Sequence, residues 1–472
     1  MKRRKFIKNS AGAAAAFTIV PSFVLGKNHV PPSDTLYMAA IGVGGRGGGI
    51  VRELTETGRV KFVALCDVDD RMAEGSYKLH PKAARFKDFR KLYDAHINEI
   101  DAFSVGTPDH THAVISLPFM RAKKHAYVEK PLTHNIHEAR LLTKVAKEQG
   151  IVTQMGNQGS SSNGIRLAQE WIDSGVLGTI TKVDCWTNRP VWPQGLRNIT
   201  EGQPIPKGLD WDLWLGPAAD RPYHEAYLPF KWRGWWDFGT GGLGDMGCHI
   251  METPFKTLGL GYPYEAEASC TTVWAGDFVE ANYDKACPPS SIVRLKFDTE
   301  KHGKVDLNWY DGGIMPDLPD ELKDGEFIGD WNGGSVFYGT KGILVTDCYS
   351  RNARLLPSSD MRYFNAPEPI IPRIKDQNHV QNFVEGCLDS TPTTSPFSYA
   401  GPLTEAVLMG NLAIKAFQYK VLKDGKKATD WAPFDYPGRR KLLWDGDAMR
   451  VTNYDKANEW VTRDYRKGWE VK

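Results

Sequence analysis

An alternation of apolar runs and amphipathic segments between residues 36 and 155 is the feature that most constrains the fold. The expected strands are 36–44, 60–67, 100–108, 125–131 and 151–156, and the expected helices are 48–57, 69–79, 112–122 and 136–149. Continuous Val, Ile and Ala runs separated by amphipathic helices are typical of a parallel sheet covered on both faces. We therefore predict a doubly wound α/β domain of the Rossmann type over residues 34–155.

A glycine-rich segment follows the first of these strands and leads into the first helix. It consists of Gly42, Val43, Gly44, Gly45, Arg46 and Gly47, and it fits the pattern G-x-G-x-x-G. In such a loop the first glycine makes a tight turn, the second lets backbone approach a pyrophosphate, and the third packs helix on strand. Asp67 ends the second strand, 20 residues after Gly47, where a carboxylate binds the ribose hydroxyls and repels a 2′-phosphate. The sequence therefore predicts a site for NAD rather than NADP.

The pattern changes beyond residue 155. A helix is expected at 163–175, a Trp- and Pro-rich loop region at 186–240, strands at 265–275, 290–298, 303–311, 334–339 and 341–347, and helices at 379–388 and 403–418. Strands with little helix between them indicate antiparallel pairing. We expect residues 156–472 to form an α+β domain built on an open antiparallel sheet.

Tryptophan is concentrated in this loop region. Seven of the fifteen tryptophans lie there: Trp186, Trp192, Trp211, Trp214, Trp232, Trp235 and Trp236. Taken singly, each is better explained as part of the core. As a cluster, their aromatic faces suit the apolar face of a pyranose ring and favour a sugar or glycoside as ligand.

Two segments carry side chains suited to acid–base chemistry. The tripeptide Glu-Lys-Pro at 129–131 ends a parallel strand, where open α/β sheets bind ligands, so Lys130 is expected to approach a substrate oxygen. Asp245 and His249 are four residues apart and share one face of an expected helix, which Pro254 should kink. Singly, these residues also fit a solvated strand end and a core histidine, but together they indicate an active site. No metal site is predicted.

The glycine loop, the strand-end E-K-P and the D-x-x-x-H helix, with "TPDHTH" at 107–112 and "LTEAVLMGN" at 403–411, resemble the Gfo/Idh/MocA oxidoreductases from about residue 36 onward. The resemblance implies that Lys130, Asp245 and His249 are catalytic. It also implies a cofactor side that includes Lys130, Thr107, Pro108, His110, Glu129 and Asn157, with Arg233 reaching the cofactor. A homo-oligomer, dimer or tetramer, formed through the second domain is a further implication.

The expected reaction is oxidation of a secondary alcohol of a sugar or glycoside. A histidine takes the hydroxyl proton, a lysine stabilises the developing alkoxide, and the nicotinamide accepts hydride. Two alternatives stay open. One is redox-neutral cleavage of a glycosidic bond, or epimerisation, by oxidation, elimination and re-reduction on the same NAD, with His110, Tyr223 and His224 as candidate second bases. The other is a carbohydrate-binding protein without catalysis.

Residues 1–33 are predicted to be an export signal and linker. Arg3 and Arg4 followed by an apolar run at 11–25 are typical of the twin-arginine route, which exports folded proteins. Pro21 interrupts the run, which is shorter than the roughly 20 residues of a membrane span, so stable insertion is not expected. The absence of a small-x-small cleavage site leaves a cleaved and an uncleaved signal open. A periplasmic or secreted protein has no nicotinamide pool, so its NAD is expected to stay tightly bound.

Charge and cysteine content limit the kinds of partner and site that the protein is expected to have. Residues 1–26 hold five of the 59 basic residues and no acidic one. Without them the formal net charge is −3, from 54 basic and 57 acidic residues. This balance provides no electrostatic reason to bind nucleic acid or an anionic membrane. The seven scattered cysteines contain no C-x-x-C, which argues against a disulfide framework or a zinc site.

Overall fold

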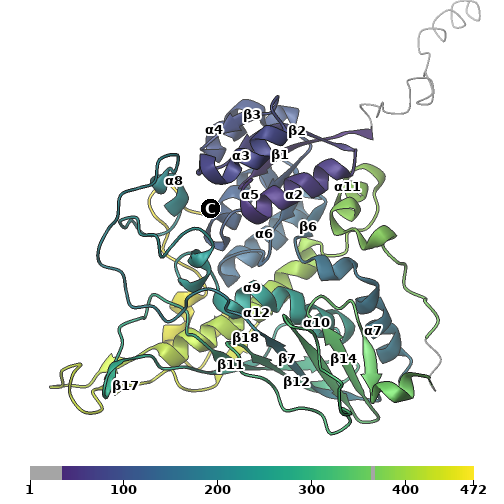
Figure 1. Ribbon diagram of the computed structural model, residues 1–472, viewed down its shortest axis with the longest axis vertical. Coiled ribbons are helices and arrows are strands. Elements are labelled where there is room, and N and C mark those ends of the chain that lie inside the picture. Colours follow the sequence, from purple (N-terminus) through teal and green to yellow (C-terminus); the bar gives the residue numbers. More distant parts are fainter. Residues whose placement is uncertain (1–33, 363–366, 472) are drawn as a thin grey trace, which may run out of the picture.

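The computed structural model describes residues 34–362 and 367–471 (Figure 1), and the predicted export signal lies outside them. The first domain is a parallel sheet with the strand order β3-β2-β1-β4-β5-β6. Its strands are β1 (Leu36–Ile41), β2 (Val60–Cys66), β3 (Ala84–Phe86), β4 (Ala102–Val105), β5 (His125–Val128) and β6 (Thr153–Met155). Alternate β1 residues enter different cores, Met38 and Ala40 in one and Ala39 and Ile41 in another. Both faces are therefore covered, and the predicted doubly wound class is confirmed.

Short polar side chains begin several helices of this domain by accepting a free backbone N–H. Asp69 accepts from Arg71 before α3, and Asn135 accepts from Glu138 before α6. The helices are α2 (Gly45–Glu56), α3 (Asp70–Leu79), α4 (Phe89–His96), α5 (His112–Arg121) and α6 (Ile136–Gln149). The edge strand β3 and the helix α4 were not predicted, because a three-residue strand is too short to show a period.

The second domain is built on a nine-stranded sheet with the order β15-β14-β13-β7-β12-β11-β8-β18-β19. The strands are β7 (Ile180–Thr187), β8 (Glu265–Cys270), β11 (Ser291–Thr299), β12 (Gly303–Tyr310), β13 (Gly333–Gly339), β14 (Ile343–Asp347), β15 (Arg354–Leu356), β18 (Leu442–Asp445) and β19 (Arg450–Val451). The sequence analysis missed β7, which lies inside the sheet between β13 and β12, and it also missed the short strands β15, β18 and β19. Because β7 runs parallel to β12, the sheet is mixed rather than purely antiparallel.

Helix α12 (Phe397–Gln418) joins the two domains. It packs against α6 of the first domain and against β8, β11 and α9 of the second. The approach to α6 is close, since a Cβ at Gly401 would lie 2.0 Å from Thr143 Oγ1. The other helices on this side of the sheet are α7 (Asn163–Asp173), α9 (Gly241–Ile250) and α10 (Glu252–Thr257). Helix α9 ends four residues before Pro254, whose ring excludes a continuous helix there.

A late segment of the chain returns to the first domain. Helix α11 (His379–Asp389) lies beside α2 (Figure 1), and its Val380, Phe383 and Val384 share a buried cluster with β1 residues. Arg59 and Asp389 are paired through Arg59 Nη2 and Asp389 Oδ1, 2.9 Å apart. Residues far apart in sequence therefore hold the nucleotide-binding half and the second domain together.

Candidate active site

A cleft of about 740 Å³ opens at the carboxyl ends of the parallel strands. The first domain lines it with Gly42 after β1, Asp67 after β2, Thr107 after β4 and Glu129 after β5. The second domain contributes residues of α9 and of the loops around it. Loops at this sheet edge are where doubly wound folds bind their ligands.

Close backbone packing accounts for all three glycines of the G-x-G-x-x-G motif. Gly42 has φ of +74°, and a Cβ there would lie 2.6 Å from Thr107 Cγ2. A Cβ at Gly44 would lie 2.6 Å from Met72 Cβ, and one at Gly47 would lie 1.8 Å from the Gly42 carbonyl oxygen. Only glycine fits these positions without movement of the backbone.

The start of α2 and the end of β2 fit the phosphates and ribose of a dinucleotide. Gly44 is the N-cap of α2 and has no side chain that could cap the first N–H groups of the helix. A Cβ at the cleft residue Gly45 would meet nothing within 4 Å. Uncapped N–H groups and open space at a helix start suit a pyrophosphate. Asp67 Oδ2 accepts the N–H groups of Val43 and Gly44 at 2.8 and 3.0 Å. Burial raises the pKa of Asp67 to about 6 despite these bonds.

Lys130 and Asp245 form a buried ion pair across the domain boundary. Lys130 Nζ donates to Asp245 Oδ1 at 2.8 Å and to the Asp245 carbonyl at 2.6 Å, and Arg233 Nε donates to the same Oδ1 at 3.1 Å. Burial opposes ionisation of Asp245, but the two cations outweigh it and hold the pKa of this carboxyl below its usual range. Burial likewise opposes charge on Lys130, yet Asp245 raises the pKa of the ammonium. Both groups are therefore ionised.

His249 lies one helical turn after Asp245 on α9 and is 4% exposed. Burial first, and then the charge of Lys130, hold the pKa of His249 well below its usual range. Its Nδ1 has no hydrogen-bond partner among the described residues, and its ring meets that of Tyr349 edge-on, with centroids 5.0 Å apart. A neutral imidazole at a cleft wall is in the form that accepts a proton.

The other predicted residues divide into two groups. The cleft is lined by Gly42, Gly44, Gly45, Arg46, Asp67, Thr107, Pro108, Glu129, Lys130, Arg233, Asp245 and His249. Arg46 Nε donates to Glu129 Oε1 at 2.9 Å, so two of these side chains hold each other. The lining does not include Gly47, His110 and Asn157.

His110 and Asn157 are buried near the cleft without reaching it. His110 packs against Trp214 and Phe238, and its Nε2 lies 3.0 Å from the Trp214 carbonyl oxygen. Burial lowers the pKa of His110 to about 3, so it is a neutral core residue. Asn157 is fully buried, and neither atom of its amide has a hydrogen-bond partner among the described residues.

Several cleft residues were not singled out from the sequence. Among them are Gln158, Arg189, Phe230, Tyr349, Arg351 and Trp469. Trp469 comes from the C-terminal tail and packs against Phe89, with ring centroids 6.1 Å apart. None lies in a motif, because tertiary folding alone brings them to the cleft.

Most of the clustered tryptophans belong to the core. Six of the seven are less than 9% exposed, and only Trp214 and Trp232 line the cleft. Trp211 and Trp214 stack with centroids 4.9 Å apart in a buried aromatic cluster. The tryptophan count therefore says less about a sugar ligand than the sequence suggested.

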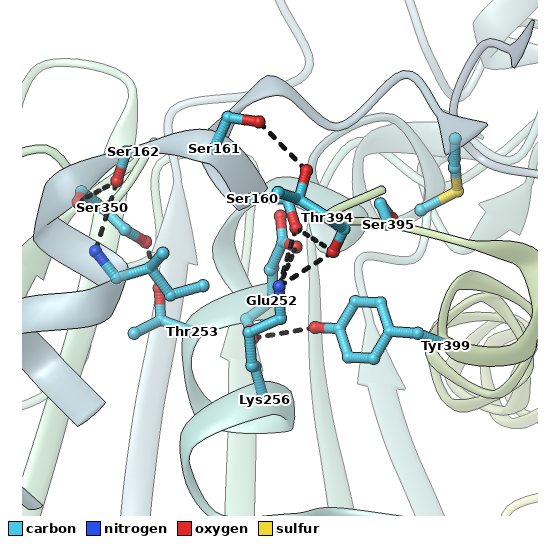
Figure 2. Close-up of polar contacts among 12 residues, drawn as sticks. Ser160, Ser161, Ser162, Glu252, Thr253, Lys256, Ser350, Thr394, Ser395 and Tyr399 are labelled. Atoms are coloured by element: carbon cyan, nitrogen blue, oxygen red, sulfur yellow. Dashed lines mark hydrogen bonds and ion pairs between the residues drawn. The ribbon is translucent and has the colours of Figure 1, made fainter. Parts of the chain in front are cut away.

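A buried polar cluster surrounds Glu252 and Lys256 of α10, outside the lining of the cleft (Figure 2). Lys256 Nζ donates to Ser160 Oγ at 2.8 Å and to the Thr394 carbonyl at 3.0 Å, and lies 3.9 Å from Glu252 Oε1. Glu252 is 1% exposed, and burial raises its pKa to about 7. The Tyr399 hydroxyl donates to the Glu252 carbonyl at 3.3 Å. These bonds tie α10 to the segment after β6 and to α12.

Comparison with known proteins places these observations in a family. Residues 36–157 match the oxidoreductase family's NAD-binding Rossmann fold, and residues 163–260 match its C-terminal alpha/beta domain. A glycosyl hydrolase family 109 protein of Shewanella pealeana is 28% identical over 170 residues, 31% of this chain and 37% of that protein. Levoglucosan dehydrogenase of Pseudarthrobacter phenanthrenivorans is 28% identical over 138 residues, 27% of this chain and 35% of that protein. The matched stretch thus spans about a third of each relative.

Solved structures share the fold over more of the chain. The WlbA dehydrogenase from Bordetella pertussis, solved with NADH and UDP-GlcNAcA, aligns with a TM-score of 0.55 at 14% identity, covering 81% of this chain and 97% of that one. The two family matches fall on the two domains whose cleft is described above. Residues 36–157 and 163–260 therefore resemble the two domains of the Gfo/Idh/MocA oxidoreductases, and the first domain is an NAD-binding Rossmann fold.

Proposed function

We propose that this protein oxidises a secondary alcohol of a sugar or glycoside and passes hydride to NAD bound in the cleft. The observation that carries the proposal is the convergence of Lys130, Asp245 and His249 on the cleft that the glycine loop also lines. Levoglucosan dehydrogenase and myo-inositol 2-dehydrogenase among the relatives support a polyhydroxy substrate.

The residues of the cleft divide the work of alcohol oxidation. His249, neutral because of burial and the nearby Lys130, takes the hydroxyl proton. The Lys130 ammonium stabilises the negative charge that develops on the substrate oxygen. Asp245 keeps Lys130 charged and in place, and Arg233 supports Asp245 from the other side. NAD, when bound, supplies the hydride acceptor.

Redox-neutral cleavage of a glycosidic bond is the second candidate. Relatives described as glycosyl hydrolase family 109 proteins and as an alpha-N-acetylgalactosaminidase favour it. On this route the first step is the same oxidation, which acidifies the neighbouring C–H and permits elimination of the leaving alcohol. Water then adds to the resulting double bond before the ketone is reduced again. The two candidates share the roles of Lys130 and His249 and differ in the product.

We also propose that the protein works beyond the cytoplasmic membrane with its NAD tightly held, and that it forms a homo-oligomer. The twin-arginine pattern of residues 1–33 supports export in the folded state. All seven cysteines are free in the part of the chain that the structure describes, which suits folding in a reducing compartment. No helix among the described residues is long and apolar enough to cross a bilayer.

A sugar panel on the protein as purified tests the proposal. Denaturation should release NAD, and addition of a substrate to the native protein should build absorbance of reduced nicotinamide. A keto-sugar product supports oxidation, whereas a released free sugar without net reduction supports cleavage. Lys130→Met should lower turnover about a hundredfold or more, and Lys78→Met, at an exposed position of α3, should not change it. Full turnover by Lys130→Met would refute the proposed roles.

A further inference from the structure

The half of the cleft next to the catalytic pair carries an excess of positive charge. Lys130, Arg189, Arg233 and Arg351 line it. Asp245 is paired with both Lys130 and Arg233. Two other carboxylates line the cleft nearby. Glu129 is paired with Arg46 at 2.9 Å, and Asp109 is 4% exposed and accepts the Thr240 hydroxyl at 2.7 Å. The backbone N–H of Arg351 donates to Asp347 Oδ1 at 2.8 Å, but neither its guanidinium group nor that of Arg189 forms an ion pair among the described residues, and both residues line the cleft.

Sheet topology brings these two arginines to the same edge. Arg189 follows β7 and Arg351 follows β14, and the intervening strand β13 is antiparallel to both. Gly333 of β13 is opposite Thr187, and Gly334 is opposite Asp347, so β7 and β14 end level with each other. The chain therefore delivers two basic side chains from segments 162 residues apart to one wall of the cleft.

Tyr349 connects this wall with the catalytic histidine. Its ring centroid is 5.0 Å from that of His249, and the Arg351 guanidinium carbon is 5.4 Å from the same Tyr349 centroid. Arg189 donates to the side-chain oxygens of Asn188 and Asn332, with the Asn332 bond at 3.2 Å. These neutral acceptors orient the guanidinium without cancelling its charge.

We propose that the sugar substrate carries an anionic substituent, which Arg189 and Arg351 bind while its carbinol faces Lys130 and His249. This inference rests on the proposed function and names its substrate class. Guanidinium groups suit the oxygens of carboxylates and phosphates, because several N–H donors form a planar fork. Uronic acids, sugar phosphates and sugar sulfates all supply such a group. The glycine loop and Asp67, which fit the dinucleotide, come from the other domain.

Matched sugar pairs test the inference on the NAD-loaded protein. Glucose is compared with glucuronate, glucose 6-phosphate and glucose 6-sulfate, and galactose with galacturonate, by calorimetric binding and by turnover. At least one charged member should bind about tenfold or more tightly than its neutral partner, and added salt should reduce the difference. The charged sugar that binds most tightly identifies whether the anionic group is a carboxylate, a phosphate or a sulfate. Equal binding of charged and neutral sugars would overturn the inference.

Two arginine variants test which residues produce the preference for a charged sugar. Arg189→Gln and Arg351→Gln should each remove about tenfold of the preference for the charged sugar while leaving the NAD content unchanged. Arg294→Gln, on the exposed side of β11, is the matched control and should keep the preference. Loss of NAD from the arginine variants without a change in sugar preference would assign them to the cofactor and refute the inference. Thermal unfolding checks that each variant is folded.

Binding and turnover separate this inference from the proposed function. Selective binding of a charged sugar without any reduced nicotinamide would support the anion site and contradict oxidation. Turnover of neutral and charged sugars at equal kcat/KM would support oxidation and contradict the anion site.

Discussion

Replacement of Gly47 by alanine probes the packing that forms the nucleotide-binding loop. A Cβ at this position would lie 1.8 Å from the Gly42 carbonyl oxygen, 2.9 Å from the Gly42 carbonyl carbon and 3.2 Å from the Gly106 carbonyl oxygen. All three atoms belong to the backbone, so no side chain can rotate away. To restore an ordinary contact of 3.4 Å, the start of α2 must move about 1.6 Å from the end of β1.

The free-energy cost follows from that displacement. Overpacking of a rigid site by one methyl group costs about 1–3 kcal/mol, and this site belongs at the upper end because only backbone can yield. Alanine regains about 1 kcal/mol of helix propensity, so the net loss of unfolding free energy is about 2 kcal/mol. The same movement displaces the N–H groups that fit the pyrophosphate, and the protein should retain little NAD.

Gly49→Ala is the matched control in the same helix. Its nearest neighbour would be Arg46 Nη1 at 3.3 Å, the far end of a flexible side chain. This variant should be more stable than the parent by about 0.5–1 kcal/mol and should keep its NAD. Urea denaturation and the NAD released per chain measure both effects. If Gly47→Ala were as stable and as NAD-loaded as Gly49→Ala, the packing argument would be wrong.

Four further predictions concern charge and the tail. Glu252 titrates at about 7 in the folded protein against an ordinary 4.5, so the folded state binds more protons and wild-type stability should fall as pH rises from 4.5 to 7. Glu252→Gln should therefore gain about 3 kcal/mol relative to wild type between pH 4.5 and 8, measured by urea denaturation, and a pH-independent difference would contradict this. Asp67→Asn should weaken NAD binding about tenfold and lower the ratio of the Kd for NADP to the Kd for NAD, both measured by fluorescence titration. An unchanged ratio of the two Kd values would exclude binding of the ribose by Asp67. Because the pKa of His249 is lowered, kcat/KM should not fall as the pH is lowered through 6.5. A fall of kcat/KM with an apparent pKa near 6.5 would contradict a neutral His249. Trp469→Ala removes a cleft wall and should speed NAD release in a competition assay, while an unchanged rate would show that the tail does not cover the cofactor.

Local patterns were sufficient to predict the first domain except for β3 and α4. Apolar runs show the strands of a parallel sheet because both faces are buried, and the glycine motif needs only its neighbours to be recognised. Asp67, Glu129 and Lys130 were expected at strand ends, and all three line the cleft. The strand β3 was not predicted because three residues are too few to show a hydrophobic period. The strand β7 was also not predicted, although it lies inside the second sheet.

The second domain depended on contacts that no local pattern reveals. Pairing of β7 with β12 and β13 joins segments more than 100 residues apart, and it decides that the sheet is mixed. The same pairing brings Arg189 and Arg351 to one wall, and the tail brings Trp469 to the cleft. The sequence by itself determined the nucleotide-binding half and the types of the side chains that we propose as catalytic, since both depend on short segments. Tertiary structure alone decided the charge of the cleft wall that holds Arg189 and Arg351, because that charge comes from distant strand ends.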